Sequence, residues 1–575
     1  MPHRALQQLS IFAGLEPAAL ASLAQRLSEH RLAGGGVLFE QGSEADGLYV
    51  LLSGQLAAFR GRGRQWLGNI RPGEAVGEMA VLSGRPRSAR VVAVRDSTLL
   101  KLDRATFDAL VLEHPRAAME LARTAFARME ASTQQRLRPR VPSTLALLPQ
   151  TAGVAVDAVA EALAEALRRY GPVALVRCGD SLDPARLSLL EATHAQVLYV
   201  AGTADAAWTE SCRRQADALL YLADSREPPG DLSRSASEDE RLRQRWLVLL
   251  HHGPIRDGAA RRWRAGVDAE RHVHLRDDRD MDRLARMLAG RSVGVVFSGG
   301  GARGFAHLGV LRAFHEAGLS IDQVGGTSFG AIVAAAVAQE WGIEEIHARL
   351  KHCFVEKNPL EDWTVPLVAL TRGVKASELL RGEFGEADIL DLPLPFYCVS
   401  ANLSRGDAHT HQNGALWLAL RASIAIPGVL PPVFEGGEVL VDGGVINNLP
   451  ADVMYRQSAG PLIGIDIAGE HALTSGVDGE ALPNLINMTA QWFQGLRRPS
   501  MLRILIRAGM VNSKATNRAN RQKLNLLLQP PVDDIDLLDW AAADRAIAAG
   551  YRHASEVLEA APDWFSGNGV FARDA

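Results

Sequence analysis

A serine between two glycines is the residue best placed to act as a nucleophile in this chain. Ser328 lies in Gly326-Thr327-Ser328-Phe329-Gly330, a G-x-S-x-G pattern between a short apolar strand and an alanine-rich helix. Glycines on both sides permit the strained turn that lifts a serine hydroxyl above a sheet, so Gly326 and Gly330 belong to the same predicted elbow. The pattern predicts that Ser328 attacks a carbonyl carbon.

A glycine-rich loop one helix earlier could hold the negative charge that such an attack creates. The apolar run SVGVVF leads directly into SGGGARG (residues 298–304), and a helix follows. Consecutive glycines at a helix N-terminus present backbone N–H groups to an anion. The loop has neither the G-K-[ST] of a phosphate loop nor the dinucleotide spacing G-x-G-x-x-G. We therefore expect an oxyanion region formed by Gly299, Gly300, Gly301 and Arg303.

A serine nucleophile needs a base, and the chain offers an aspartate and several histidines. Asp442 in EVLVDGGVINNLP stands at the end of a predicted strand, and two glycines let the chain turn away at once. It follows Ser328 by 114 residues, so only the fold can bring the two together. His409 and His411 could instead provide the base or share a metal ion. They lack a strand-end loop with glycine support, as do His352, His471 and His553, and Asp442 is favoured.

These motifs together carry a resemblance to a known family. SGGGARGFAHLGVL, GGTSFG and VDGGVINNLPADV match, in order and spacing, the motifs of patatin-like phospholipases. The resemblance implies a Ser–Asp dyad with Ser328 as nucleophile and Asp442 as base, and with no histidine, metal or catalytic cofactor. It also implies that RASIAIPGVLPPVF (residues 421–434) lines an acyl pocket.

The N-terminal part shows a different texture, with a second candidate site. Between residues 34 and 102, short apolar runs alternate with glycine-bearing turns, which is typical of an antiparallel β-sandwich. The segment GEMAVLSGRPRSA is similar to the phosphate-binding cassette of cyclic-nucleotide-binding domains. Its Gly77, Glu78, Arg87 and Ser88 are the candidate binding residues. Arg87 would pair with the cyclic phosphate, which a guanidinium matches geometrically, and Glu78 with the ribose 2′-hydroxyl.

The sequence does not decide whether the ligand of this cassette is cAMP or cGMP. Serine at position 88, in place of threonine, favours cAMP slightly over cGMP. The alternative is a domain that keeps the sandwich and has lost the ligand. Retention of both Glu78 and Arg87 favours a competent pocket with a regulatory role.

The order of the segments predicts a multidomain fold. We expect a β-sandwich (jelly-roll) cyclic-nucleotide-binding domain with flanking helices (1–138), an intervening α/β scaffold (142–290), a patatin-like α/β hydrolase core (291–456) and a helical C-terminal part (457–575). This order resembles neuropathy target esterase and its bacterial relatives. The intervening part is similar to a nucleoside-triphosphatase-like layer without its phosphate loop. One nucleotide cassette and no N-terminal membrane anchor are departures from that pattern.

The composition and charge of the chain limit the kinds of partner and the compartment that we expect for it. The chain has 575 residues and a net charge of −4, which gives no reason to expect a polyanion partner, and no DNA-binding helix pair follows the sandwich. Its four cysteines lie far apart, which favours a reducing compartment over a disulfide scaffold. No apolar window is long enough to span a membrane and no signal peptide is evident. We expect a cytoplasmic protein with peripheral membrane contact. The candidate contact residues are Trp341 and the 354–370 stretch with Trp363; the alternative is that these are core residues.

The favoured function is a serine carboxylic-ester hydrolase of lipids, a lysophospholipase or phospholipase modulated by a cyclic nucleotide. The alternative is a non-catalytic nucleotide sensor whose patatin-like domain binds lipid or a partner. Acyl chain, headgroup, sn-position, oligomeric state and the sign of the nucleotide effect are left open.

Overall fold

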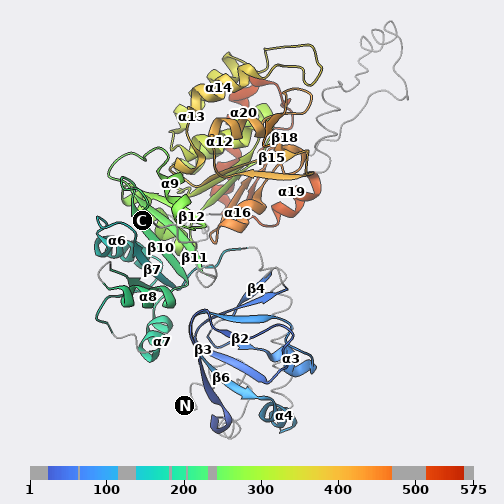
Figure 1. Ribbon diagram of the computed structural model, residues 1–575. Helices are drawn as coiled ribbons and strands as arrows, with labels where there is room; N and C mark the ends of the chain where they lie inside the picture. The colour runs from blue at the N-terminus through green and yellow to red at the C-terminus, as the bar shows by residue number, and fades with distance from the viewer. Residues whose placement is uncertain are drawn as a thin grey trace. The chain divides into compact units, whose positions relative to one another are not determined.

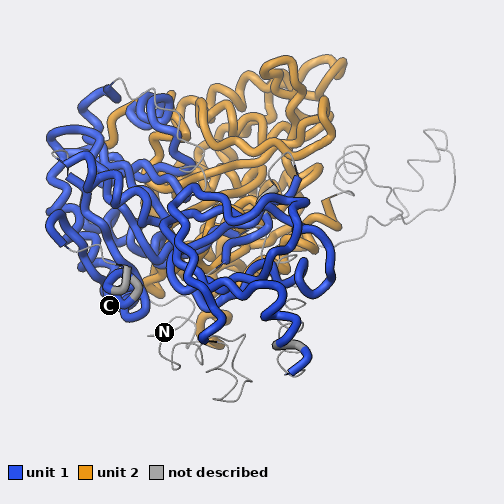
Figure 2. The backbone as a smooth tube through the Cα atoms, turned by 60° about the horizontal axis from the view of Figure 1, so that its bottom comes forward, with its two compact units in different colours: residues 1–254, 259–289 blue, residues 255–258, 290–575 orange. Residues whose placement is uncertain are grey.

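The computed structural model describes residues 24–61, 65–70, 72–113, 138–180, 184–202, 205–230, 243–468 and 513–561. The chain forms two compact units, shown in different colours in Figure 2. Unit 1 comprises Met1–Pro254 and Ala259–Ala289, and unit 2 comprises Ile255–Gly258 and Gly290–Ala575. Unit 1 contains the sandwich and the intervening α/β part, and unit 2 contains the candidate hydrolase site.

The first part of unit 1 is an antiparallel β-sandwich. Its elements are β1 (Ser28–Leu32), β2 (Val37–Phe39), β3 (Gly47–Arg60), β4 (Gln65–Ile70), β5 (Ala75–Val76), α3 (Glu78–Ser83), β6 (Arg90–Asp103) and α4 (Arg104–Glu113). The strands pair in the order β1-β6-β3-β4, with β2 on β6 and β5 on β3. Leu48 and Val50 of β3 pack into one apolar cluster and Tyr49 and Leu51 into another, as a strand buried on both faces requires. The predicted β-sandwich is confirmed.

The second part of unit 1 is a parallel α/β sheet. Its elements are β7 (Thr144–Pro149), α6 (Val156–Arg168), β8 (Val173–Val176), α7 (Pro184–Thr193), β9 (Gln196–Val200), α8 (Ala206–Gln215), β10 (Ala218–Asp224), β11 (Gln244–Leu250), α9 (Ala259–Gly266), β12 (Arg271–Leu275) and α10 (Asp278–Leu288). The strand order is β12-β11-β10-β7-β9-β8, and every pair is parallel. Strands buried on both faces read as continuous apolar runs, which is why the sequence predicts them.

Unit 2 is built on one eight-stranded mixed sheet. Its first half comprises β13 (Gly294–Phe297), η4 (Gly301–Phe305), α11 (Ala306–Glu316), β14 (Gln323–Thr327), α12 (Phe329–Ala338), α13 (Ile343–Leu350), η5 (Lys351–Glu356), α14 (Val374–Phe384) and η6 (Ile389–Asp391). Its second half comprises β15 (Phe396–Asn402), β16 (Asp407–His411), α15 (Leu416–Ser423), β17 (Val433–Glu435), β18 (Glu438–Asp442), η7 (Gly443–Val445), α16 (Ala451–Gln457), β19 (Leu462–Ile465), α19 (Ser513–Arg521), β20 (Leu526–Leu528), η8 (Trp540–Ala542) and α20 (Ala543–Ala560).

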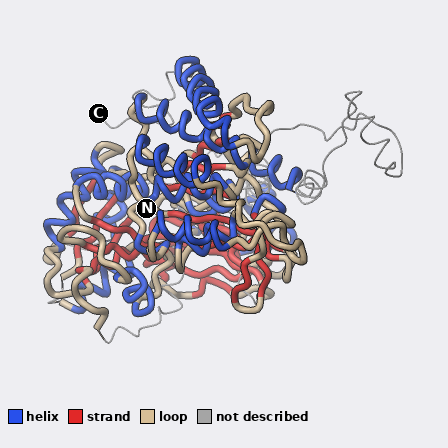
Figure 3. The backbone as a smooth tube through the Cα atoms, turned by 90° about the horizontal axis from the view of Figure 1, so that it is seen from above, coloured by secondary structure: helices blue, strands red, loops and turns tan. Residues whose placement is uncertain are grey.

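Helices cover both faces of this sheet. Alternate residues of β13 face opposite ways: Val295 and Phe297 pack with α11, α12 and α20, and Val296 packs with α16. Figure 1 labels α12, α16 and α20 around the strands of unit 2, and Figure 3 distinguishes helices from strands by colour. The strand order is β17-β18-β15-β14-β13-β19-β20, with β16 on β15. The predicted multidomain α/β and β fold is confirmed.

The segment 457–575 differs from the helical part that the sequence suggests. It contributes β19 and β20, which extend the sheet beyond β13, in addition to α19 and α20. Runs of three or four apolar residues, LIGI and LLL, are too short to show a strand period. The predicted domain bounds stay predictions, since 1–23, 114–137, 469–512 and 562–575 lie outside the described residues.

Helix α20 nevertheless packs within unit 2, because two glycines let it touch α11 backbone to backbone. A Cβ atom placed on Gly550 would lie 2.0 Å from the Ala306 carbonyl oxygen, and one on Gly309 would lie 2.0 Å from the Ile547 carbonyl oxygen. Neither position has room for a side chain without moving a helix. Since Ala306 directly follows the glycine-rich loop, the C-terminal helix supports that loop from behind.

We expect Gly550→Val to destabilise unit 2 by roughly 1–3 kcal/mol or more, the range for overpacking a close contact. Thermal and denaturant unfolding would measure it. Gly382→Ala in α14 is the matched control, since a Cβ there has no atom within 4 Å. It should be neutral or stabilising by up to about 1 kcal/mol. Equal stability of Gly550→Val and wild type would contradict the tight α11–α20 contact.

Candidate active site

Two strands end against the same edge of β15, and this brings the site together. Strand β14 runs parallel to β15, with Thr327 opposite Val399. Strand β18 runs antiparallel to β15, with Asp442 opposite Ser400. Strand β16 occupies the other edge of β15 at these positions. The last residues of β14 and β18 therefore meet head to head, and strand pairing brings Ser328 and Asp442 together although they are 114 positions apart in the sequence.

The structure brings Ser328 and Asp442 into direct contact. The Ser328 hydroxyl donates a hydrogen bond to Asp442 Oδ2 over 2.6 Å. Ser328 has φ 54° and ψ −129°, a conformation that non-glycine residues adopt at a cost of about 1–3 kcal/mol. Its backbone N–H donates to the Ser423 hydroxyl over 2.9 Å, which fixes the turn.

The two flanking glycines are required by close approach. A Cβ on Gly326 would lie 2.7 Å from the Gly330 backbone, and one on Gly330 would lie 2.4 Å from the Ser298 carbonyl oxygen. The strand–turn–helix geometry predicted for the G-x-S-x-G pattern is therefore the one this chain adopts.

The Asp442 carboxylate is buried and has a second donor. Its Oδ1 accepts the Gly444 N–H over 2.7 Å, so the turn that follows β18 also holds the carboxylate. Burial raises the pKa of Asp442 to about 6, although the hydrogen bonds from Ser328 and Gly444 act to lower it. Asp442 is thus a stronger base than an ordinary aspartate and is still mostly ionised at neutral pH.

The glycine loop lies against the serine. A Cβ on Gly299 would lie 2.9 Å from Ser328 Cβ, so only glycine fits there. The Gly299 N–H donates to the Asn448 carbonyl over 3.2 Å, and Asn448 Nδ2 donates to the Gly299 carbonyl over 3.1 Å. His307 donates from Nε2 to the Ser298 carbonyl over 3.0 Å. These bonds hold the loop beside Ser328.

Arg303 points toward the C-terminal segment of unit 2. Its guanidinium donates to the backbone carbonyls of Ile535 (2.7 Å), Ala468 (3.3 Å) and Asp533 (3.3 Å). The Arg303 guanidinium, which we expected in the oxyanion region, is therefore hydrogen-bonded to three backbone carbonyls. Arg303 therefore positions the loop from behind.

Two supporting residues were not identified from the sequence. Ser423 receives the Ser328 N–H and donates to the Val399 carbonyl over 2.7 Å. Asn448 bridges the glycine loop, and within the described residues its buried Oδ1 has no hydrogen-bond partner. Both lie in quoted motifs, RASIAIPGVLPPVF and VINNLPADV. Their spacing alone gives no sign of a supporting role.

The paired histidines lie on β16 and have other partners. His411 Nε2 is 2.8 Å from the Ser400 hydroxyl, and burial lowers the pKa of His411 to about 3. His409 contacts Arg405. In the part of the chain that the structure describes, no group of three His, Cys, Asp or Glu side chains could hold a metal ion. His471 lies outside that part.

In the sandwich, Arg87 is buried and held by the chain itself. Its Nη2 donates to Asp46 Oδ1 (2.6 Å) and to the Gly47 carbonyl (2.7 Å), and Nη1 donates to the Gly77 carbonyl (3.0 Å). Its guanidinium lies 4.2 Å from the centre of the Phe39 ring. A Cβ on Gly77 would be 2.2 Å from Arg87 Nη1, which explains the glycine that opens the cassette.

Asp46 is the negatively charged partner of Arg87. Partial burial raises its pKa, but hydrogen bonds from Lys101, Tyr49 and Arg87 bring the pKa of Asp46 down to about 2. The carboxylate is therefore ionised at any physiological pH. Ser88 is exposed, and Glu78 is buried at the start of α3.

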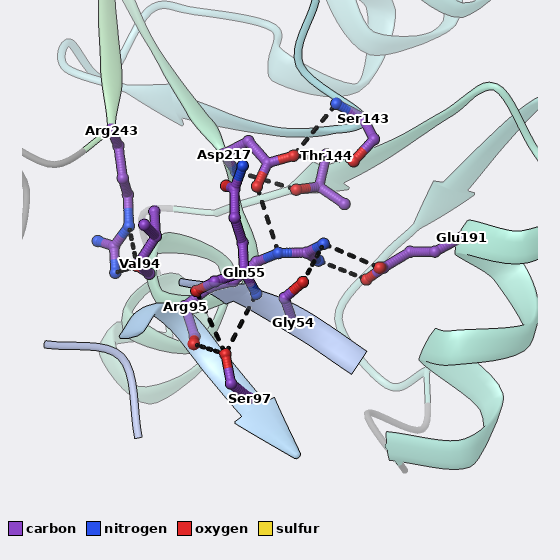
Figure 4. Close-up of polar contacts among 10 residues, drawn as sticks. All are labelled: Gly54, Gln55, Val94, Arg95, Ser97, Ser143, Thr144, Glu191, Asp217 and Arg243. Carbon is purple, nitrogen blue, oxygen red and sulfur yellow. Dashed lines mark hydrogen bonds and ion pairs between the residues drawn. The ribbon is translucent and has the colours of Figure 1, made fainter. Parts of the chain in front are cut away.

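Three consecutive residues of β6, Val94, Arg95 and Asp96, join the sandwich to the α/β part of unit 1, and Figure 4 shows the contacts of the first two. Arg95 lies between two carboxylates, with Nη2 at 2.9 Å from Glu191 and Nε at 3.2 Å from Asp217. Arg243 donates twice to the Val94 carbonyl, over 3.0 and 2.8 Å. Gln215 donates to Asp96 over 3.2 Å. A cavity of about 460 Å³ beside this joint is lined only by unit 1 residues.

Comparisons with known proteins match all three parts of the chain. A family model described as Patatin-like phospholipase matches residues 295–455. A Cyclic nucleotide-binding domain model matches 29–114, and a Neuropathy Target Esterase family P-loop like domain model matches 185–282.

Relatives cover nearly the whole chain. An uncharacterized NTE family protein of Mycobacterium tuberculosis is 31% identical over 97% of both chains. Lysophospholipase nte1 of Aspergillus niger is 29% identical over 97% of this chain and 44% of its own length, so this chain spans less than half of that relative. Among solved structures, the catabolite activator protein of Thermus thermophilus is 27% identical over 28% of this chain and 68% of that chain, with a TM-score of 0.21.

A patatin-like domain with an intact serine elbow hydrolyses carboxylic esters of lipids, and this chain is an enzyme of that class. The identity shared over nearly the full length of the mycobacterial protein makes the chain a member of the neuropathy target esterase (NTE) family. The resemblance drawn from the sequence motifs is confirmed.

The raised pKa of Asp442 predicts how Ser328 reactivity depends on pH. Protonated Asp442 cannot accept the serine proton, so fluorophosphonate labelling of Ser328 should fall about tenfold per pH unit below a midpoint near 6. Labelling rates between pH 4.5 and 8 would measure this. Asp442→Asn should label slowly and without this dependence. A wild-type rate that stays flat to pH 4.5 would contradict Asp442 as the group that activates Ser328.

Proposed function

We propose that this chain hydrolyses lysophospholipids or phospholipids with a Ser328–Asp442 dyad and no histidine base. The observation that carries the proposal is the 2.6 Å hydrogen bond from the Ser328 hydroxyl to Asp442, formed at an elbow beside a glycine loop. The Aspergillus niger relative is a lysophospholipase by name, which supports a lysophospholipid as the substrate class.

In the first stage, Ser328 Oγ attacks the ester carbonyl carbon while its proton moves to Asp442. Because the Gly299 N–H already bonds to the Asn448 carbonyl, the donors for the resulting oxyanion are the N–H groups of Gly300 and Gly301. When the tetrahedral intermediate collapses, the C–O bond to the alcohol breaks. Asp442 returns the proton to the leaving oxygen, and the acyl group stays on Ser328.

In the second stage, Asp442 takes a proton from water as that water attacks the acyl carbonyl carbon. The bond to Ser328 Oγ then breaks, the serine takes the proton back, and the fatty acid leaves. One carboxyl group thus serves as base and acid in turn. A pKa near 6 suits both roles at neutral pH better than the ordinary value of an aspartate.

Asp442→Asn should lower kcat by about 10²–10⁴-fold, the usual cost of losing a general base, and Ser328→Ala should abolish turnover. Hydrolysis of a soluble short-chain ester and of lysophosphatidylcholine would measure both. His409→Ala and His411→Ala are the controls and should change kcat little, since His411 bonds to Ser400. A histidine variant as inactive as Asp442→Asn would restore a triad.

We further propose that the sandwich binds a cyclic mononucleotide through Arg87, Glu78 and Ser88. The phosphate would replace Asp46 as the charged partner of the Arg87 guanidinium, which exchanges one ion pair for another. Strand β6 begins three residues after Arg87 and carries the joint at Val94, Arg95 and Asp96. This short path supports coupling between the nucleotide and the α/β part of unit 1.

Arg87→Ala should weaken cAMP binding most, by roughly 10- to 150-fold, because a hydrogen bond to a charged group contributes about 1.5–3 kcal/mol. Glu78→Ala should weaken it less and reduce discrimination against 2′-deoxy-cAMP. Titration calorimetry with cAMP and cGMP measures both. Asp46→Asn is the control, since it removes the competing carboxylate and should bind at least as tightly as wild type. No heat from the wild-type protein at millimolar nucleotide would reject the site.

Regulation by the nucleotide is tested separately from nucleotide binding, by the rate of ester hydrolysis. Nucleotide should change the ester hydrolysis rate, within the roughly 5- to 150-fold that allosteric coupling usually allows. Glu191→Gln keeps the shape of the Arg95 contact and weakens its charge, so it should alter the size of the rate effect without altering calorimetric binding. Binding with no rate change in any variant would leave the sandwich as a docking module.

Peripheral contact with a membrane completes the proposal, because the substrate is a membrane lipid. No helix in the described residues is long and apolar enough to cross a bilayer.

A further inference from the structure

Residues 363–371 of unit 2 form a short apolar hairpin, which we call the WTV hairpin. Its sequence, WTVPLVALT, contains no charged residue. Four large apolar side chains on it are exposed: Trp363 (66%), Val365 (72%), Leu367 (90%) and Val368 (66%). No other stretch of the described residues has as many exposed large apolar side chains so close together.

The structure separates this hairpin from the other apolar residues that the sequence analysis groups with it. Trp341 stacks on Phe384 at 5.1 Å and under Arg349 at 4.4 Å. Phe354 is buried and packs on Phe329 and Trp540. Phe354 belongs to the core and Trp341 is partly buried against it, so only the hairpin remains as a candidate surface.

The hairpin is held rigidly at its base. Trp363 pairs with Thr371 across the two arms, and the Thr364 N–H donates to the Leu370 carbonyl over 3.0 Å. Asp362 receives the Lys375 N–H at one oxygen and faces the buried guanidinium of Arg421. A tip that is both apolar and fixed loses little conformational entropy on binding.

The base of the hairpin rests on the segment that supports the dyad. Leu370 N–H donates to the Gly428 carbonyl over 2.9 Å, and Thr371 donates to the Val429 carbonyl through its N–H (3.1 Å) and its hydroxyl (2.8 Å). A few residues earlier on the same segment, Ser423 receives the Ser328 N–H and the Ala425 carbonyl receives the Asp442 N–H. The hairpin and the dyad thus share one support.

We propose that the WTV hairpin inserts into the surface of a phospholipid bilayer and presents the Ser328 site to its substrate. This inference rests on the proposed lipid-hydrolase function and names the surface that contacts the membrane. A hairpin without charge fits the acyl–headgroup boundary, where tryptophan and aliphatic side chains gain most from leaving water. Because the contact is apolar, it requires no anionic lipid and persists at high salt.

A dye on the hairpin tip tests insertion directly in the full chain. Cys178 is the exposed cysteine in the described residues, and Cys212, Cys353 and Cys398 are buried. Leu367→Cys in a Cys178→Ser background, labelled with nitrobenzoxadiazole, should shift to the blue and brighten on phosphatidylcholine vesicles. The same dye on Cys178 of the wild-type protein, in unit 1, is the control and should not change.

Vesicle flotation tests how much the hairpin side chains contribute to the affinity of the protein for a bilayer. Leu367→Ser and Val365→Ser should each lower partitioning onto phosphatidylcholine vesicles by roughly tenfold or more, the scale for losing one inserted aliphatic side chain. Leu112→Ser, at a position 82% exposed in unit 1, is the matched control and should float like wild type. Raising the salt to 1 M should not release the wild-type protein.

Two enzyme assays distinguish failure of this inference from failure of the proposed function. The hairpin variants should hydrolyse a soluble short-chain ester at the wild-type rate and should be slower only on lipid in vesicles. A wild-type protein that is inactive on both substrates would reject the proposed function.

Other occupants of the hairpin give different results. Active variants that float like wild type, with no dye shift at position 367, would overturn the inference. A dye already shielded from quencher without vesicles would indicate that another segment of the chain covers the tip. A fall in molar mass caused by Leu367→Ser, with unchanged flotation, would assign the hairpin to a second copy of the chain.

Discussion

The catalytic unit depends on the meeting of two strand ends at one edge of β15. Strands that approach head to head leave room for a single hydrogen-bonded pair between them, and here that pair is Ser328 with Asp442. Burial between strand ends also raises the pKa of the Asp442 carboxylate, so the topology that supplies the contact supplies the basicity.

The close approach of these strand ends requires glycine at several positions, because a side chain there would collide with the neighbouring backbone. Gly299, Gly326 and Gly330 each lie within van der Waals distance of another backbone or of Ser328 itself. Asn448 and Ser423 then fix this crowded backbone by bonding to its amides and carbonyls. The geometry of the site therefore depends on the glycines as much as on the functional side chains. Its hydrogen bonds maintain the strained turn at Ser328.

The sequence predicts the parts of this arrangement that are local. The elbow and the glycine loop are readable because glycine spacing reports backbone geometry directly, and the buried parallel strands are readable as apolar runs. The role of Ser423 was not predictable, since a serine that receives a backbone N–H leaves no periodic pattern. Likewise, β20 is three residues long, and nothing near Arg87 in the sequence indicates that Asp46, 41 residues earlier, is its partner.

The ion pairs of Arg95 bear on how a cyclic-nucleotide-binding domain of this kind can be exchanged between proteins. Arg95 has only 3% of its surface exposed, and both of its carboxylate partners come from the α/β part. A sandwich excised near residue 138 would keep this guanidinium on its surface and lose both anions that neutralise it. The smallest portable module is therefore the whole of unit 1, and a chimaera joined within the 138–142 linker would lose the connection that makes its two parts one body.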